Sequence, residues 1–479
     1  MNKITRRAFL KKSALGAGAL GLSARSWGQV AGANDDIRIA VVGFNGRGAN
    51  HISAWEKMKG VRLVALCDVD SNVLAHQVNR AKDQGRPTGG YTDLRKLLAN
   101  KDIDAISIAT PNHWHATATV WGAQAGKDVY VEKPISHNIR EGEQMVAAQK
   151  RYQKIIQAGT QSRSSHGIKE AVEWVQAGNL GKIRVSRGLC YKRRASIGKT
   201  TGPQSIPKSV DYDVWLGPAP LTPPRREKFH YDWHWFWDYG AGDLGNQGVH
   251  EMDVARWFLG ESAVAPRIMS IGGRLGYEDD AETPNTLIVF QDYAKAPLVM
   301  EVRGLPAKAG SKNMDSYKGG QVGIVVECEG GYVLVPDYNS AIVHDNDGKV
   351  IKSFKGSTSH FENFIKAVRS RNQNELNAPI LEGHLSTALC HTANISYRLG
   401  KQQAPDAIRE QIKGDKEATT TFQRMTEHVA ANGVDMDKTP ATLGMMLRMN
   451  QADASFVENQ DANDLLMRKP REPYIIELT

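Results

Sequence analysis

The sequence is poor in cysteine and lacks long hydrophobic runs. Its 479 residues include four cysteines, which stand far apart and form no C-x-x-C pair. This pattern argues against a zinc knuckle, a thioredoxin-like motif and a disulfide-dense scaffold, and it predicts buried free thiols. A membrane-spanning helix needs about 18 or more consecutive apolar residues, whereas the longest weakly apolar run, 14–24, has 11. We therefore expect no membrane span.

Acidic residues are absent from the first 34 residues, and this local absence accounts for most of the net charge of +9. Six basic residues lie in that segment, so the remaining chain is close to neutral. A nearly balanced chain does not indicate a nucleic-acid partner. The length, together with the lack of any low-complexity tract, predicts two to four packed domains.

The N-terminal residues carry a paired arginine in a specific context. Thr5-Arg6-Arg7-Ala8-Phe9-Leu10-Lys11 precedes a short run rich in Gly and Ala, and no cysteine follows that run. The arrangement resembles a twin-arginine signal peptide without a lipid anchor, and an ordinary basic amphipathic helix is the alternative. The resemblance implies a signal peptide over residues 1–33, export of the folded protein by the twin-arginine machinery, and a periplasmic location.

Residues 37–48 combine a strand with a turn rich in glycine. The β-branched run 37–42 is followed by a turn and then by residues that can form a helix to about Lys59. Such a turn lets the backbone approach a pyrophosphate at the N-terminus of the helix. Asn45 stands where the motif G-x-G-x-x-G has its middle glycine. We predict cofactor contacts from all six residues of the turn: Gly43, Phe44, Asn45, Gly46, Arg47 and Gly48.

Asp68 follows a second strand, 61–67. A carboxylate at that strand end can accept both ribose hydroxyls of adenosine and would repel a 2′-phosphate, so NAD is favoured over NADP; a solvated turn acid is the alternative. Two further strands, 105–109 and 128–131, run into residues 110–115 and 132–134. Strands that alternate with helices predict an α/β fold with a parallel, doubly wound sheet and a ligand site at the carboxyl ends of its strands.

The glycine turn, the Thr-Pro-Asn-x-x-His segment and the Glu-Lys-Pro segment together resemble the Gfo/Idh/MocA oxidoreductase family, which includes glucose–fructose oxidoreductase and inositol dehydrogenases. The resemblance implies an NAD-binding Rossmann domain over residues 34–158 and a substrate-binding α/β domain over residues 159–400. The second domain is expected to hold a large, mostly antiparallel sheet and returning helices, and residues 401–479 form a C-terminal extension. We also expect tightly bound NAD, a homo-oligomer, and further cofactor contacts from Thr110, Pro111, Asn112, His115, Glu132 and Lys133.

The family resemblance implies that Lys133 touches both the substrate hydroxyl and the nicotinamide region. A partly desolvated amine beside a positive ring should lose proton affinity and exchange protons near neutral pH. Residues 240–253 predict a helix, and the resemblance implies that His250 in it is the second catalytic residue. Asn246 stands where relatives commonly have an aspartate, and an amide cannot take a proton, so His250 or Lys133 must serve as base. A buried structural role is the alternative for His250.

Residues 230–239 are dense in aromatic side chains. Trp233 and Trp235 could face a pyranose ring, although an ordinary aromatic core explains them equally well. We expect substrate contacts from these two residues and from Arg163, Lys133, Asn246 and His250. The histidine spacings in 113–115 and 230–234 permit a metal site, but the family motif accounts for the first and we predict none.

The resemblance implies an exported NAD-dependent oxidoreductase that acts on a hydroxyl of a sugar or glycoside, with oxidation at C3 of a glycoside as the preferred version. An alternative is an NAD-dependent glycosidase that oxidises its substrate transiently and eliminates the glycosidic oxygen. A third reading is a non-catalytic protein that binds NAD or sugar. Retention of Lys133 and His250 favours catalysis.

We predict that export depends on Arg6 and Arg7. Replacing both with Lys keeps the charge but removes the pair on which the resemblance rests, so the protein should remain in the cytoplasm. Cell fractionation measures the outcome, and unchanged appearance in the periplasm would contradict the twin-arginine interpretation.

Overall fold

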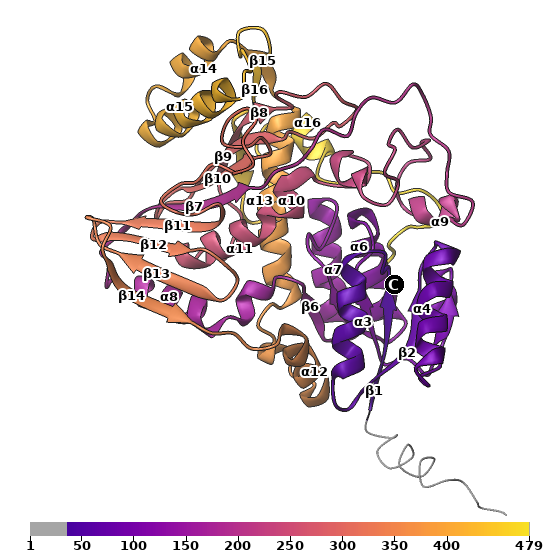
Figure 1. Ribbon diagram of the computed structural model, residues 1–479. Coiled ribbons are helices and arrows are strands. Elements are labelled where there is room, and N and C mark those ends of the chain that lie inside the picture. Colours follow the sequence, from indigo (N-terminus) through magenta and orange to yellow (C-terminus); the bar gives the residue numbers. More distant parts are fainter. Residues whose placement is uncertain (1–35, 479) are drawn as a thin grey trace, which may run out of the picture.

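Two sheets with helices packed on them organise residues 36–478, the part of the chain that the computed structural model describes (Figure 1). The signal peptide predicted for residues 1–33 lies outside the described residues. All four cysteines are buried and free, as predicted. Among residues 36–478, no helix is both long enough and apolar enough to cross a bilayer.

The N-terminal sheet has six parallel strands in the order β3-β2-β1-β4-β5-β6. From β1 the chain adds β2 and β3 on one side, and it then crosses back to add β4, β5 and β6 on the other side. The carboxyl ends of β1 and β4 therefore flank the crevice in which such sheets bind ligands. This arrangement confirms the predicted Rossmann fold. Its strands are β1 (Ile37–Val42), β2 (Val61–Cys67), β3 (Gly89–Tyr91), β4 (Ala105–Ile108), β5 (Asp128–Val131) and β6 (Ile156–Ala158).

Side-chain caps fix several helices of this domain at the ligand-binding edge. Asp70 caps α4 (Ser71–Asp83) by accepting from two backbone N–H groups, and Asn138 caps α7 (Ile139–Tyr152). By contrast, α3 (Arg47–Lys57) begins at Gly46 with no side-chain cap. The first N–H groups of α3 therefore remain available to an anion.

The second sheet is large and mostly antiparallel, as predicted; β7 and β10 form its one parallel pair within the described residues. One face packs against α8 (His166–Gln176), α11 (Gly248–Leu259) and α13 (Ile380–Arg398), which bury a continuous apolar cluster. The central strands are β7 (Ile183–Tyr191), β8 (Arg267–Gly273), β9 (Thr286–Asp292), β10 (Leu298–Arg303), β11 (Val322–Cys328), β12 (Gly331–Val335), β13 (Ser340–His344) and β14 (Val350–Lys355).

Residues 401–478 are integrated into this domain. β15 (Lys401–Gln403), β16 (Ala441–Leu443) and β17 (Leu447–Asn450) extend the sheet beyond β8. α14 (Pro405–Ile412) and α15 (Lys416–Ala431) form the gold pair of helices in Figure 1, and they cover part of the second face of the sheet. The chain then passes α16 (Gln460–Asp464) and returns to the Rossmann domain, where its C-terminus lies.

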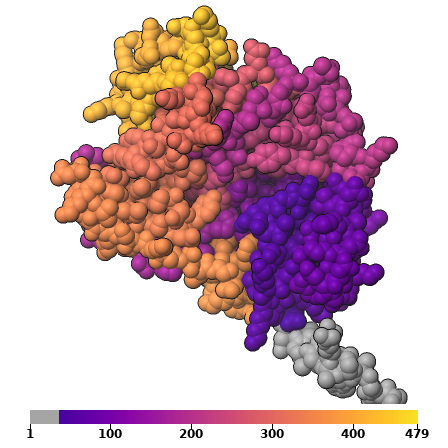
Figure 2. All heavy atoms as spheres, viewed as in Figure 1, coloured from indigo at the N-terminus to yellow at the C-terminus, as the bar shows by residue number. Residues whose placement is uncertain are grey.

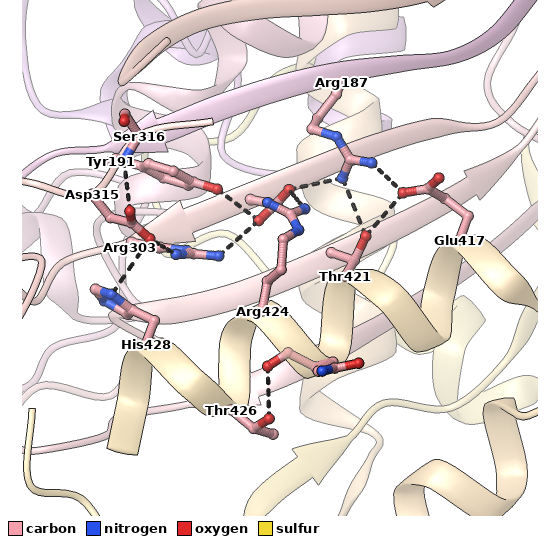
Figure 3. A network of polar contacts seen from close by, with 12 residues as sticks. Arg187, Tyr191, Arg303, Asp315, Ser316, Glu417, Thr421, Arg424, Thr426 and His428 are labelled. Carbon is pink, nitrogen blue, oxygen red and sulfur yellow. Dashed lines mark hydrogen bonds and ion pairs between the residues drawn. The ribbon is translucent and has the colours of Figure 1, made fainter. Parts of the chain in front are cut away.

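Charged side chains occupy the contact between α15 and the sheet (Figure 3). Glu301 on β10 is fully buried and accepts from Arg187 Nη1 at 2.7 Å, Tyr191 Oη at 2.8 Å and Arg303 Nη2 at 3.2 Å. Arg424 on α15 is a further donor to the same carboxylate. Burial alone would raise the pKa of Glu301, but the surrounding guanidinium groups lower it to about 2.

We predict that Glu301→Ala destabilises the protein by about 3–5 kcal/mol, because guanidinium groups would lose their buried counter-ion. Glu417→Ala is the matched control: this carboxylate also pairs with Arg187 but is one-third exposed, so its loss should cost about 1 kcal/mol or less. Urea unfolding measures both. Because the folded-state pKa of Glu301 is depressed, its contribution is present above its unfolded-state pKa and is lost as the pH falls toward 2. Equal losses in the two variants would contradict this account.

Candidate active site

A cavity of about 290 Å³ lies between the Rossmann sheet and a segment of the second domain. The Rossmann domain lines it with Leu94 and with four stretches: the glycine turn, the end of β2 at Asp68, residues 109–112 with Trp114 and His115 after β4, and Glu132 with Lys133 after β5. The second domain contributes Val214, Trp215, His230, Tyr231, Trp233, His234 and Asn246. The structure thus brings most of the predicted cofactor residues to one site; Gly48 lies just behind the lining.

The glycine turn leaves no room for side chains at its two ends. Gly43 has a φ of 75°, and a Cβ there would lie 2.8 Å from Thr110 Cα. A Cβ on Gly48 would lie 2.0 Å from the carbonyl oxygen of Gly43. The bare backbone and the uncapped start of α3 form a cradle that fits a pyrophosphate.

Asp68 is held rigidly at the edge of the cavity. Its Oδ2 accepts from the N–H of Phe44 and its Oδ1 from the N–H of Asp70, both at 3.0 Å. Burial raises the pKa of Asp68, while these two N–H groups favour its ionised form. A fixed carboxyl group at the end of β2 fits the ribose of a dinucleotide.

Residues 192–240, here called the crossing segment, pass from the second domain over the Rossmann edge. The carbonyl of Ser209 accepts from Ser71 N–H at 2.8 Å, and His230 Nε2 lies 3.0 Å from Asp70 Oδ2. At the other end, Trp114 Nε1 donates to the carbonyl of Trp215 at 3.0 Å. In Figure 2 the magenta part of the surface adjoins the indigo domain. The crossing segment therefore roofs the cavity from the end of β2 to the end of β4.

The C-terminal tail, residues 465–478, holds the crossing segment down. Arg471 Nη2 donates to the carbonyl of Asp213 at 2.7 Å and its Nη1 pairs with the carboxylate of the same residue. Arg468 Nη2 donates to the carbonyl of His113 at 2.8 Å. Tyr474 is buried against Trp114 and Trp121. No motif in the tail signals this contact, so the sequence analysis missed it.

Lys133 lies where the Rossmann domain meets the second domain. Its Nζ donates to the carbonyl oxygen of Asn246 at 2.5 Å, and a cis peptide bond joins it to Pro134. Burial lowers the pKa of Lys133, in the direction expected for a proton-exchanging amine. Asn246 lines the same cavity, and its side-chain Nδ2 lies 3.5 Å from Asp243 Oδ1.

Glu132 is an internal anchor as well as a lining residue. Its Oε1 accepts from Arg47 Nε at 2.9 Å, lies 3.0 Å from His51 Nε2, and accepts from Gln161 Nε2 at 3.1 Å. Burial alone would raise the pKa of Glu132, but the hydrogen bond from His51 and the nearby positive charges hold it well below its usual range.

His250 and Glu251 lie in the first turn of α11, and the charge of Lys133 acts on both. Burial lowers the pKa of His250 to about 3, so its imidazole is neutral at pH 7; it is a weak base there, although its unprotonated nitrogen can accept a hydrogen bond. Its Nδ1 has no hydrogen-bond partner, and its ring lies 5.0 Å from that of Tyr338. Burial raises the pKa of Glu251 to about 8, and its Oε1 accepts from Gln247 Nε2 at 3.1 Å. Sequence reasoning gave no role to Glu251, although it lies in the stretch 240–253, and it missed Tyr338, which belongs to no motif.

The remaining predicted substrate residues divide into two groups. Trp233 lines the cavity, with its ring stacked 3.6 Å from that of His234. Trp235, Arg163 and His250 do not line it. Trp235 is buried beside Arg194. Arg163 forms ion pairs with Asp253 and Glu382 at 2.9 and 3.0 Å, so its guanidinium joins α11 to α13 instead of reaching the cavity.

The paired histidines considered as metal ligands have other partners. His115 lies 2.6 Å from the carbonyl of Pro134 and 2.8 Å from that of Thr110, and His113 lies 2.9 Å from the carbonyl of Trp215. Within the described range, no group of three or more His, Cys, Asp or Glu residues is placed to hold a metal ion.

Comparison with known proteins agrees with this architecture. A model of an oxidoreductase family described as an NAD-binding Rossmann fold matches residues 37–160, and its companion for a C-terminal alpha/beta domain matches residues 164–427. Solved structures share the fold. The WlbA dehydrogenase from Bordetella pertussis, in complex with NADH and UDP-GlcNAcA, aligns with a TM-score of 0.54 and 20% identity over 74% of this chain and 94% of that one. An oxidoreductase domain protein from Kribbella flavida aligns with a TM-score of 0.55 and 18% identity, over 75% of this chain and 96% of that one.

Curated relatives match a shorter region. A protein named glycosyl hydrolase family 109 protein from Shewanella baltica (strain OS155) is 34% identical over 132 residues, which is 26% of this chain and 29% of the relative. A protein of the same name from Shewanella pealeana is 32% identical over 149 residues, which is 30% of this chain and 31% of the relative. The chain thus matches less than a third of the length of these relatives.

We predict that Gly48→Ala abolishes cofactor retention, because its Cβ would displace the carbonyl of Gly43 and open the cradle. Heat denaturation followed by chromatography identifies the nucleotide that purified protein releases. Gly414→Ala is the control, since nothing lies within 4 Å of a Cβ there. We expect NAD from the parent and the control and none from Gly48→Ala. Full retention in that variant would contradict the assignment of the turn, and release of NADP alone would contradict that of Asp68.

Proposed function

Because the chain belongs to the Gfo/Idh/MocA oxidoreductase family, whose two models match 37–160 and 164–427, we propose that it oxidises a hydroxyl group of a sugar or glycoside with bound NAD. The observation that carries the proposal is the approach of Lys133 Nζ to Asn246 at 2.5 Å, within the cavity that also holds the glycine turn. A proton-exchanging amine and a dinucleotide cradle thereby share one site.

The residues of the cavity have defined roles in this proposal. The N–H groups at the start of α3 and the glycine turn hold the pyrophosphate, and Asp68 accepts the ribose hydroxyls and disfavours a 2′-phosphate. When bound, NAD supplies the hydride acceptor. Lys133, whose pKa is lowered by burial, lines the cavity and is the group placed to take the hydroxyl proton. His250 lies outside the lining, and its pKa of about 3 makes it a weak base that accepts a hydrogen bond more readily than a proton. The amide of Asn246 orients the hydroxyl.

A glycosidase that uses transient oxidation is the second candidate. It is favoured by the name of the curated relatives, glycosyl hydrolase family 109 protein, although the match covers a minor part of their length. Both candidates share the first proton and hydride transfers, so the same residues serve either one. Oxidation at C3 of a glycoside remains our preferred version.

We also propose that the protein is exported by the twin-arginine machinery and acts in the periplasm, on the strength of the Arg6-Arg7 context. A homo-oligomeric state stays a prediction. The crossing segment and the tail, which pack over this edge of the Rossmann domain, would favour retention of the cofactor during export.

We predict that Lys133→Met and His250→Ala each lower turnover by about 10²–10⁴-fold while NAD is retained. The rate of the parent should rise as Lys133 loses its proton, at a pH below the ordinary lysine pKa of 10.5. This limb of the pH profile should vanish in Lys133→Met. Lys150→Met, at an exposed position on α7, is the control. Near-normal turnover in His250→Ala would assign the histidine a structural role and leave Lys133 as the base.

A single turnover distinguishes the two candidate functions. We would mix the NAD-loaded protein with a glycoside and follow nicotinamide absorbance and products. We expect stoichiometric NADH and an intact keto-glycoside. Cleaved aglycone with NAD restored, together with solvent deuterium at sugar C2, would overturn the dehydrogenase in favour of the glycosidase.

A further inference from the structure

A cation without a counter-ion lies beside the proposed active site. Lys192 directly follows β7, and its Nζ donates to Gln247 Oε1 at 3.0 Å. No ion pair joins Lys192 to any residue that the structure describes. An ammonium group has three donors, so two remain for a ligand.

Gln247 connects Lys192 to the proposed catalytic residues. It follows Asn246, whose carbonyl oxygen accepts a hydrogen bond from Lys133 Nζ. Its Nε2 also donates to Tyr338 Oη at 3.1 Å, and the Tyr338 ring contacts that of His250. Lys192 lies outside the cavity lining, but it is close enough to Lys133 for its charge to contribute, after burial, to the lowered pKa of that amine.

The other charged groups around this place are already neutralised. Arg194 pairs with Asp243 at 2.6 Å, and Arg47 pairs with Glu132 at 2.9 Å. Glu251 is the remaining carboxyl group, and burial raises its pKa to about 8, so it is mostly protonated at pH 7. The charge left over is positive and resides on Lys192 and Lys133.

The chain that leaves β7 continues this excess of positive charge. Residues 192–210 contain five basic residues and no acidic residue. Arg194 is paired as described, and Lys199 lies 3.3 Å from Glu278. Arg193 and Lys208 are exposed and, like Lys192, form no ion pair within the described residues. A neutral sugar would not require unpaired basic side chains next to its binding site.

We propose that the substrate carries an anionic group, a carboxylate or a sulfate, and that Lys192 binds it. This inference rests on the proposed function and names its substrate class: a glycoside with a uronosyl residue or a sulfate ester near the carbinol that is oxidised. The free N–H donors of Lys192 match either oxyanion, and the basic stretch 192–210 attracts a longer acidic chain.

The test compares substrates that differ only in charge. Methyl glucuronoside and methyl glucoside form one pair, their galacto counterparts form a second, and methyl glucoside 6-sulfate separates sulfate from carboxylate. For the NAD-loaded parent we expect higher kcat/KM and tighter calorimetric binding for an anionic member. Lys192→Gln should lower that preference by about 10- to 100-fold, the range for a charge-assisted hydrogen bond. Lys192→Glu should shift preference to methyl 6-amino-6-deoxyglucoside.

Lys199→Gln is the matched control, since it removes a charge from the same stretch at an exposed position and should keep the preference. Equal kcat/KM and equal binding for charged and neutral members, or an equal loss of preference in the control, would overturn the anionic substrate while leaving sugar oxidation intact. Preferential binding of an anionic member without NADH formation would overturn the oxidation and retain the anion site.

Discussion

The buried carboxylate of Glu132 is the constraint on which the candidate site depends. It sits at the end of β5 and ties together the start of α3 through Arg47, the interior of α3 through His51, and the segment after β6 through Gln161. These contacts fix the direction in which the chain leaves β5, and the next residue is Lys133. This placement of the chain lets Lys133 Nζ donate to the carbonyl oxygen of Asn246 in the second domain. An unpaired carboxylate at this depth would be strongly unfavourable. Because Glu132 pairs with Arg47 of the glycine turn and directly precedes Lys133, one buried carboxylate helps to position both the turn and the proposed catalytic lysine.

The Rossmann half was predictable because its signals are local. A β-branched strand, a glycine turn and a helix follow one another directly, and the carboxyl ends of parallel strands must share one edge. Asp68, Thr110 and Glu132 meet in the cavity for that reason. The same rule misplaced Arg163. This residue also follows a Rossmann strand, but Asp253 offers its guanidinium a buried partner, and that ion pair turns it away from the cavity.

Contacts made by distant parts of the chain were not predictable. The crossing segment was recognised only as aromatic, because its position depends on hydrogen bonds with Ser71 and Trp114 in another domain. The tail shows no motif, yet Arg471 and Tyr474 fasten that segment. The packing of residues 401–478 was also not predictable. Helix α15 pairs its charged side chains with charges of opposite sign on the sheet, and the pattern of apolar residues does not reveal such a contact (Figure 3).

The crossing segment and the tail also constrain how the proposed reaction must proceed. They cover the edge of the Rossmann sheet from Asp70 to His113, which is the side where Asp68 would hold the adenosine. If these contacts stay in place, they would slow the exit of a dinucleotide placed there, and exchange of the cofactor would then be a slow way to end a catalytic cycle. The hydride must then depart through the region around Lys133 and His250, where the substrate enters. Substrate and acceptor would occupy this region in turn, and the same argument holds when the acceptor is the oxidised sugar itself. The dehydrogenase and the glycosidase would therefore differ in which molecule accepts the hydride from the reduced nicotinamide ring. The protein groups around that ring would be the same in both.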